Sequence, residues 1–395
     1  MSHEFAYNYE KNLSRIFNKA SLLGIICFGI FLWPQCSDNK SIDKSILNST
    51  SINLDVEIQD TVLTDLFNIA NNIYAISLET TKESIIGNIH NLAINDDYIF
   101  VGTVNDYFLF DKRGTYIKSP FNTGRGPGEV LFPVFCHRII NNKIWFNDRV
   151  NNRNFIKNYD IQSEKWSYAK IPTWANITKL VVDSDSTISY ISNSIHSYDN
   201  KISFEFTFIR QNTDAIILDS ISFGKSSSEF HSFFLLKAPN GGVYAMNPRG
   251  DSLTYIMNGR YEVIWRNYFD PIPVTNSRNQ EIYGSSLLSY STNSLLLLRK
   301  NVRITGNTRR FGSPEILLID RVKGRASYMH LFLKNKTLEV DPNNIFLLGN
   351  DQFCIVMSPF EIQNEMKRSD DLSMFFSRIK ISSDDNPILI FGVFS

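Results

Sequence analysis

The chain has 395 residues, and its 40 lysines and arginines balance 40 aspartates and glutamates, so the formal net charge is zero. Hydrophobic residues are 43% of the sequence and aromatic residues 13%, which allows a large core and excludes a globally disordered chain. The neutral balance argues against nucleic acid as a partner, because no overall positive field attracts phosphates. The length suggests two or three domains, although propellers and barrels of this size form one.

The first 36 residues have the features of a targeting segment. Lys11, Arg15 and Lys19 precede an apolar run over residues 20–33, which is shorter than the ~20 residues that cross a bilayer as a helix. Such a run is typical of a signal peptide. Residues 1–36 are therefore predicted to be a signal or lipoprotein leader, or an N-terminal membrane anchor.

Cys36 follows the apolar run directly, and the chain then becomes polar. The position resembles the acylation site of bacterial lipoproteins, in which Gly, Ala or Ser usually precedes the cysteine; this chain has Gln35 there. We expect Cys36 to be lipidated, with an uncleaved anchor or a buried helix as the alternatives. Lipidation would hold the protein in the bacterial cell envelope, at the outer membrane or the periplasmic face.

Two cysteines, Cys136 and Cys354, remain after the leader, and each lies in an apolar, strand-like stretch. They could form one disulfide in an oxidising compartment or stay as two buried thiols. No Cys-x-x-Cys pair is present, so the sequence favours neither a structural zinc ion nor a redox dithiol.

Residues 37–72 are rich in Ser, Asn and Asp at first, which is typical of a polar tether that holds a domain away from a membrane. A short helical turn is predicted within residues 61–70. From Ile73 onward the dominant pattern is short apolar or alternating runs separated by turn residues, which predicts β-strands. Examples are residues 98–104 and 107–110, with Asp96-Asp97 and residues 111–114 as the turns.

The same four-strand unit recurs along the chain at intervals of roughly 40–50 residues, which is the spacing of propeller blades. Residues 73–395 are therefore predicted to form an all-β, six-bladed β-propeller with four-stranded antiparallel blades. A β-sandwich or two stacked barrels are the alternatives. The predicted blades lie at about 91–120, 133–172, 177–221, 230–269, 281–330 and 346–395.

Four segments resemble the six-bladed β-propeller lipoproteins of Bacteroidetes, a family that is largely uncharacterised. They are residues 78–87, 110–114, 124–129 and 383–391. The resemblance runs from about Ile73 to the C-terminus and implies the fold and a place in the envelope more than an activity. It also implies that an N-terminal strand completes the last blade, for which residues 74–78 are the natural candidate.

The segment Gly124-Arg-Gly-Pro-Gly-Glu129 is the most distinctive local motif. It lacks the Gly-Lys-Ser/Thr of a phosphate loop and the glycine spacing of a dinucleotide site. Its glycines fit a tight turn between the first two blades. Because loops between blades reach toward the central channel, Arg125 and Glu129 are also candidate ligand contacts.

No motif predicts a metal, a cofactor or a catalytic nucleophile. The six histidines show no ligand spacing, residues 183–186 lack the glycine and closing glutamate of a calcium loop, and no Gly-x-Ser-x-Gly elbow is present. Adjacent carboxylates such as Asp370-Asp371 fall in polar turns. The histidines are His3, His90, His137, His196, His231 and His330.

A basic stretch over residues 299–325 is the one local departure from neutrality, and it is predicted to be a long loop in the fifth blade. It is either a solvated loop or a patch for lipid phosphates or an anionic glycan. Arg249-Gly-Asp251 matches an adhesion tripeptide but also fits a tight turn. The candidate patch residues are Arg299, Lys300, Arg303, Arg309 and Arg310.

The sequence thus predicts an envelope-anchored propeller that acts as a non-catalytic binding or scaffolding module. We expect a monomeric domain without a cofactor, which meets the membrane through its N-terminal anchor and binds an envelope protein or a glycan. The alternative is a hydrolase or lyase that acts on carbohydrate or a lactone at the channel mouth, because a propeller fold does not fix function.

Overall fold

The computed structural model describes residues 50–52, 58–124, 129–130, 137–150, 153–172, 177–184, 186–198, 201–226, 234–238, 242–246, 252–257, 260–267, 279–290, 294–305, 308–311, 315–320, 325–335, 337–349 and 351–394. The predicted leader with Cys36 lies outside these residues, as do Arg125, Cys136 and the Arg249-Gly-Asp251 turn. All structural statements below concern the described part of the chain.

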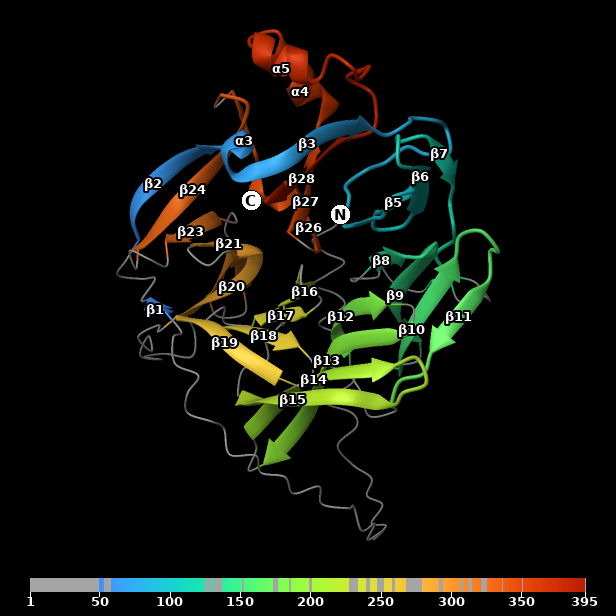
Figure 1. Ribbon diagram of the computed structural model, residues 1–395, viewed down its shortest axis with the longest axis vertical. Coiled ribbons are helices and arrows are strands. Elements are labelled where there is room, and N and C mark those ends of the chain that lie inside the picture. The colour runs from blue at the N-terminus through green and yellow to red at the C-terminus, as the bar shows by residue number, and fades with distance from the viewer. Residues whose placement is uncertain are drawn as a thin grey trace. The chain divides into compact units, whose positions relative to one another are not determined.

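Six sheets follow one another along the chain as the blades of a propeller, which confirms the predicted fold (Figure 1). The first blade has β4 (Asn91–Ile94), β5 (Tyr98–Gly102), β6 (Tyr107–Asp111) and β7 (Tyr116–Lys118). The second has β8 (His137–Ile140), β9 (Lys143–Val150), β10 (Arg153–Asp160) and β11 (Trp166–Ala169). The third has β12 (Ile177–Ser184), β13 (Thr187–Tyr198), β14 (Lys201–Asn212) and β15 (Ile217–Ser226).

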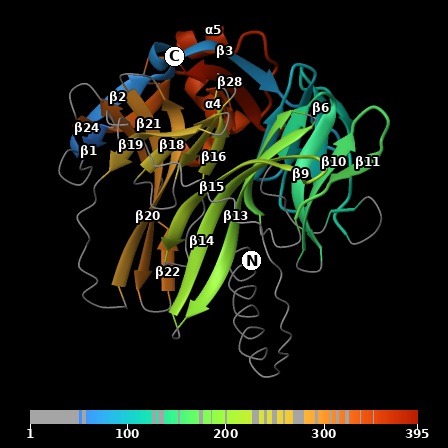
Figure 2. The same ribbon diagram turned by 60° about the horizontal axis from the view of Figure 1, so that its bottom comes forward.

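The fourth blade has β16 (Phe234–Lys237), β17 (Val243–Met246), β18 (Ser252–Met257) and β19 (Arg260–Asn267). The fifth has β20 (Asn279–Tyr290), β21 (Ser294–Thr305), β23 (Glu315–Asp320) and β24 (Arg325–Leu333), with β22 (Thr308–Phe311) paired to β21 and β25 (Leu338–Glu339) paired to β24. The sixth has β26 (Ile345–Gly349), β27 (Gln352–Met357), β28 (Ile388–Phe394) and β3 (Ala70–Ser77). Figure 2 shows β13, β14, β20 and β22 reaching beyond the shorter strands.

The N-terminal segment adds one strand to each of the last three blades. β1 (Thr50–Ile52) pairs in parallel with β19, β2 (Ile58–Asp65) pairs in parallel with β24, and β3 pairs antiparallel with β28. With β1 the fourth sheet has five strands, and with β2, β22 and β25 the fifth has seven, rather than the four predicted for every blade. Part of the segment that the sequence predicts as a tether thus lies on the propeller, including the four-residue helix α3 (Leu66–Ile69).

Strand β3 closes the ring, as the sequence predicts for residues 74–78. Tyr74 lies opposite Phe391 of β28, and their rings stack with centroids 5.3 Å apart. Ile76 lies opposite Leu389 and packs against the apolar cluster between the last blade and the first. The first and last parts of the propeller thus share one sheet, and β28 has a partner on both sides.

Apolar side chains fill the spaces between neighbouring blades. Because successive residues of a strand point to opposite faces, Ile99 and Val101 pack toward the sixth blade, whereas Phe100 packs toward the second. Trp145 and Tyr190 belong to the apolar cluster between the second and third blades. This burial on both faces explains why β5 and β6 read as continuous apolar runs in the sequence.

Three of the four segments that carry the family resemblance meet where the first and last blades join. They are residues 78–87, 110–114 and 383–391. Asn386 is 3% exposed; its Oδ1 accepts from the Ile86 N–H at 2.8 Å, and its Nδ2 donates to the carbonyl oxygens of Glu79 at 2.8 Å and Ser84 at 2.6 Å. Gly114 has a φ of +89°, and its carbonyl oxygen accepts from the Glu79 N–H at 2.8 Å. These contacts hold the loop after β3 to both blades. The residues that carry the family resemblance therefore lie at the closure of the ring.

Two short helices, α4 (Pro359–Met366) and α5 (Asp370–Phe375), lie between β27 and β28. Ser369 caps α5 by accepting from the Leu372 N–H at 3.3 Å. Ile362, Leu372 and Phe376 are fully buried in the core shared with the fifth and sixth blades. The helices therefore extend the core of the last blade.

Candidate functional site

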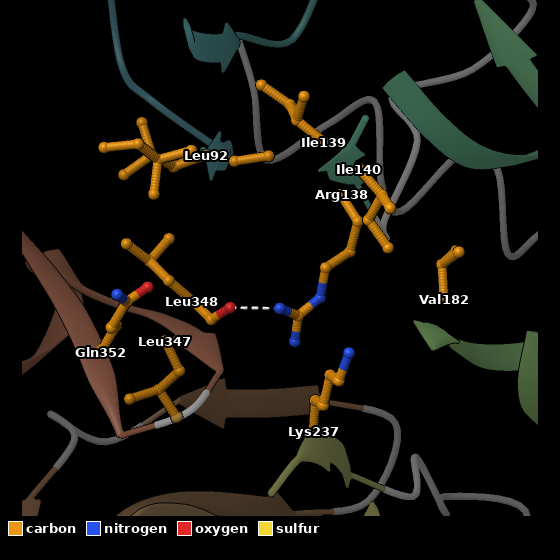
Figure 3. A pocket seen from close by; sticks show the side chains of 11 residues that line it. Leu92, Arg138, Ile139, Ile140, Val182, Lys237, Leu347, Leu348 and Gln352 are labelled. Carbon is orange, nitrogen blue, oxygen red and sulfur yellow. Dashed lines mark hydrogen bonds between the residues drawn. The ribbon is translucent and has the colours of Figure 1, made fainter. Parts of the chain in front are cut away.

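The first strands of the blades surround a cavity of about 160 Å³, here called the channel pocket (Figure 3). These strands are innermost: β4 contacts β8, β8 contacts β12, β12 contacts β16, and β26 contacts both β4 and β16. The described residues that line the channel pocket belong to the first, second, third, fourth and sixth blades. Its lining residues are Leu92, Ala93, Ile94, Arg138, Ile139, Ile140, Val182, Lys237, Leu347, Leu348 and Gln352.

Arg138 brings one positive charge to the channel pocket. It alternates on β8 with Ile139, which is buried against the first blade, so the Arg138 side chain takes the opposite direction and points into the cavity (Figure 3). Its Nη1 donates to the carbonyl oxygen of Leu348. Gly349 has a φ of +92°, and a Cβ there would lie 2.6 Å from Nη1. The left-handed backbone favours glycine here, and any other side chain would also have to shift the flexible end of Arg138.

Lys237 brings a second positive charge from the end of β16, and Figure 3 shows its amine reaching toward the guanidinium of Arg138. The Lys237 Nζ donates to the main-chain carbonyl oxygen of Asp183 at 2.9 Å. The Asp183 carboxylate accepts from the Ser189 hydroxyl at 2.8 Å and lies 3.2 Å from the Arg210 Nε. Burial raises the pKa of the Asp183 carboxyl, against the opposing effects of Ser189, Arg210 and Lys237.

Among the described lining residues, Arg138, Lys237 and the amide of Gln352 are the polar side chains of the channel pocket. No carboxylate or imidazole is among its lining side chains in the described part of the chain. Two like charges that face one cavity repel each other, and an anion between them removes that cost. The arrangement suits the binding of an anionic group better than proton transfer, which needs a donor and an acceptor of matched pKa.

Of the two ligand contacts predicted in the glycine-rich loop, Glu129 alone is described, and it is not among the described residues that line the channel pocket. Glu129 is half-buried, and its carboxylate lies against Gly124, where a Cβ would collide with it. The loop is held by the Gly124 N–H, which donates to the Val130 carbonyl oxygen at 3.0 Å. Arg125 lies outside the described residues, so its role stays a prediction.

The basic stretch is not a long loop in the fifth blade, because the described residues from Arg299 to Phe311 lie mainly in β21 and β22. In the register Arg303 lies opposite both Glu281 and Arg310, and Arg299 lies opposite Glu315. Lys300 lies opposite Gly284 and Arg309 opposite Ile304. The alternation with Val302, Ile304 and Phe311 favours strands over a loop.

Within the described ranges, no group of three His, Cys, Asp or Glu side chains is placed to hold a metal ion. His330 pairs instead with Glu339, with its Nδ1 2.6 Å from the Glu339 carboxylate. Cys354 is a buried free thiol whose pKa is raised by burial. No helix in the described part of the chain has the length and apolar character to cross a membrane.

Sequence reasoning missed both cations of the channel pocket. The available signal was one basic residue in an otherwise apolar first strand of a blade. These residues are Arg138 in His-Arg-Ile-Ile and Lys237 in Phe-Leu-Leu-Lys. In a propeller such a strand lines the channel, so a charge there faces the central cavity or a neighbouring blade.

A family model described as a 6-bladed β-propeller, DUF5128, matches residues 42–280, more than half of the chain. The chain belongs to this family of six-bladed β-propellers of unknown function. No curated protein matches the chain.

Among solved structures, a Bacteroides fragilis protein that is described as exported has a TM-score of 0.55 and 15% sequence identity. The match covers 88% of this chain and 99% of that protein, and it agrees with the propeller fold. The TolB protein of Acinetobacter baumannii has a TM-score of 0.34 and 12% identity, with 75% of this chain and 63% of that one covered.

Proposed function

We propose that the chain is a binding module of the bacterial cell envelope and that its channel pocket holds an anionic ligand between Arg138 and Lys237. One observation carries the proposal: two cationic side chains from different blades point into the same small cavity (Figure 3). The hydrolase or lyase alternative has less support, because the described lining offers no carboxylate or imidazole to exchange a proton.

Thermal unfolding of the full chain tests this function. Benzoate and inorganic phosphate are compared with chloride at equal ionic strength, because a ligand that binds the folded state raises the Tm by mass action. We expect at least one of the two anions to raise the Tm of the wild type but not that of Lys237→Gln. Lys112→Gln, which changes an exposed lysine in the turn after β6, serves as the control. An equal rise in all three proteins would refute binding at the channel pocket.

The place in the envelope is part of the same proposal. It is supported by the leader-like sequence of residues 1–36 and by the description of the Bacteroides fragilis protein as exported. We propose that Cys36 carries the lipid. Metabolic labelling with a radioactive fatty acid should mark the wild type but not Cys36→Ala, and equal labelling of both would remove the lipid anchor. An envelope protein or glycan as a further partner stays a prediction.

A further inference from the structure

A row of charged and polar side chains crosses the third blade beside the channel pocket. Ser189 of β13 lies opposite Arg210 of β14, and Arg210 lies opposite Asp219 of β15, so these side chains share one face of the sheet. Asp183 of β12 joins the row, because its carboxylate accepts from the Ser189 hydroxyl at 2.8 Å and lies 3.2 Å from the Arg210 Nε. The row faces the fourth blade, since Phe208, two residues before Arg210, belongs to the apolar cluster between these two blades.

The fourth blade brings Lys237 to the same place. Its Nζ donates at 2.9 Å to the main-chain carbonyl oxygen of Asp183, and its positive charge lowers the pKa of the Asp183 carboxyl against the effect of burial. The amine is therefore close to two acceptors of one residue, the main-chain oxygen that it bonds and the carboxylate. Only the first of these leaves the full charge of Lys237 to the channel pocket, because a carboxylate would neutralise it.

The Asp183 carboxylate competes for this amine. The Asp183 side chain is 8% exposed, and its Oδ1 has no hydrogen-bond partner among the described residues. A buried carboxylate needs a compensating charge, since an unpaired ion in a protein interior is costly. Arg210 is the one cation of the row and supplies this charge, so Lys237 is not drawn away from the main-chain oxygen.

We infer that Arg210 is a positioning residue of the channel pocket. By pairing with the Asp183 carboxylate, it leaves the amine of Lys237 on the main-chain carbonyl oxygen, where its charge is available to an anion. Without Arg210, the flexible lysine side chain turns to the carboxylate, and the channel pocket loses one of its two charges. This inference rests on the proposed function, since it explains how one of the two cations of the same site is kept in place. It assigns opposite effects to the two members of one ion pair.

Calorimetric titration of the full chain, purified in detergent, tests the inference with inorganic phosphate and with benzoate at constant ionic strength. The anion that binds the wild type more tightly is then used for every variant. Arg210→Gln should weaken its binding about tenfold, as Lys237→Gln does, since both changes take one charge from the site. Asp183→Asn should instead strengthen binding about threefold, because it removes a negative charge near Lys237.

The double variant Arg210→Gln/Asp183→Asn separates positioning from a structural role. Without the carboxylate nothing attracts Lys237, so the double variant should bind the anion at least as tightly as the wild type. Arg210→Lys, which keeps a positive charge beside the carboxylate, should weaken binding by less than about threefold. Arg113→Gln, which breaks the pair of the exposed Arg113 with Asp111, is the matched control and should bind as the wild type does. Thermal unfolding of each variant shows that it is folded before titration.

The outcomes separate the two proposals. If the wild type binds neither anion, or if Lys237→Gln binds as the wild type does, the proposed function fails and the positioning role fails with it. If binding depends on Lys237 but Arg210→Gln binds as the wild type does, the positioning role alone is wrong. It is also wrong if Asp183→Asn weakens binding, or if the double variant binds no better than Arg210→Gln. Should Arg210→Gln not fold, the result for Asp183→Asn decides.

Discussion

At the channel pocket, main-chain carbonyl groups hold side chains that carry full charges. The bonds from Arg138 to Leu348 and from Lys237 to Asp183 end on carbonyl oxygens, which orient a cation without cancelling its charge. Gly349 leaves space for the guanidinium beside this carbonyl group, because a larger residue there would shift it. The positive potential of the channel therefore depends on backbone geometry as much as on the charged residues.

Asp183, whose main-chain carbonyl oxygen accepts from the Lys237 amine, predicts how stability depends on pH. Burial raises the pKa of its carboxyl above the ordinary 3.8, so the folded state binds this proton more tightly than the unfolded state does. The stability from this group is complete below about pH 3.8 and is lost as the pH rises through the folded-state pKa. We expect the free energy of unfolding of the wild type to fall over this range relative to that of Asp183→Asn.

Urea unfolding of the two proteins at a series of pH values from about 3 to about 7 measures this difference. Other titrating groups cancel in the comparison, because both proteins share them. A difference that stays constant with pH would contradict the prediction.

Asn386 gives a second prediction at the scale of one residue. Asn386→Ala removes the partner of the Ile86 N–H and of the Glu79 and Ser84 carbonyl oxygens, and we expect a loss of about 3 kcal/mol of stability. Asn343→Ala, at an exposed position in the turn before β26, should change stability by less than about 0.5 kcal/mol. Chemical denaturation measures both, and equal effects would show that Asn386 does not lock the ring.

At the scale of the element, alternation predicts the strands well. The blade boundaries in the structure, such as Asn91–Lys118 for the first, lie within a few residues of those predicted. The stretch around Arg303 misled the prediction, because many charges and two glycine-containing turns resemble a loop when cross-strand partners such as Glu281 are unknown. β1 and β2 were missed because their partners lie in blades far along the chain.

The helices of the last blade give a prediction of their own. Phe376 directly follows α5 as its C-cap and is fully buried, whereas Met374 of α5 is 69% exposed. Phe376→Ala should cost about 3–5 kcal/mol, because it removes a ring and leaves a cavity in the core. Met374→Ala should leave stability within about 0.5 kcal/mol of the wild type. Urea unfolding compares them, and a small effect of Phe376→Ala would mean that the helices are not part of the core.

At the scale of the whole molecule, the six-bladed ring and its closing strand follow from a repeating pattern, and repeats are visible in one sequence. The channel pocket is a different kind of feature. Arg138 and Lys237 are about a hundred residues apart, and only the circular arrangement of the blades brings them together. Local motifs such as residues 124–129 attract notice in a sequence, whereas a site assembled from single residues of several blades leaves no local motif.

Ring closure can be observed through Cys354. Its thiol is buried between the last and first blades and its pKa is raised, so little reactive thiolate forms while the ring is closed. We expect iodoacetamide to label Cys354 roughly a hundredfold faster in Asn386→Ala than in the wild type, in line with the weaker closure. Asn343→Ala should label as the wild type does.

Peptide mass spectrometry measures the labelling of Cys354 separately from that of the other cysteines. Equal rates in the wild type and Asn386→Ala would show that the thiol becomes accessible by a route other than opening of the ring.

The strands of the N-terminal segment also set the order in which the molecule is completed during synthesis. β1, β2 and β3 are made first, but their partners β19, β24 and β28 appear in that same order much later in the chain. Each of these strands therefore stays unpaired until its partner strand has been synthesised, and β3 is the last of the three to pair. A chain that stops before Ile388 has no strand to receive β3, so an incomplete product keeps an open ring with exposed edges that proteases and chaperones recognise.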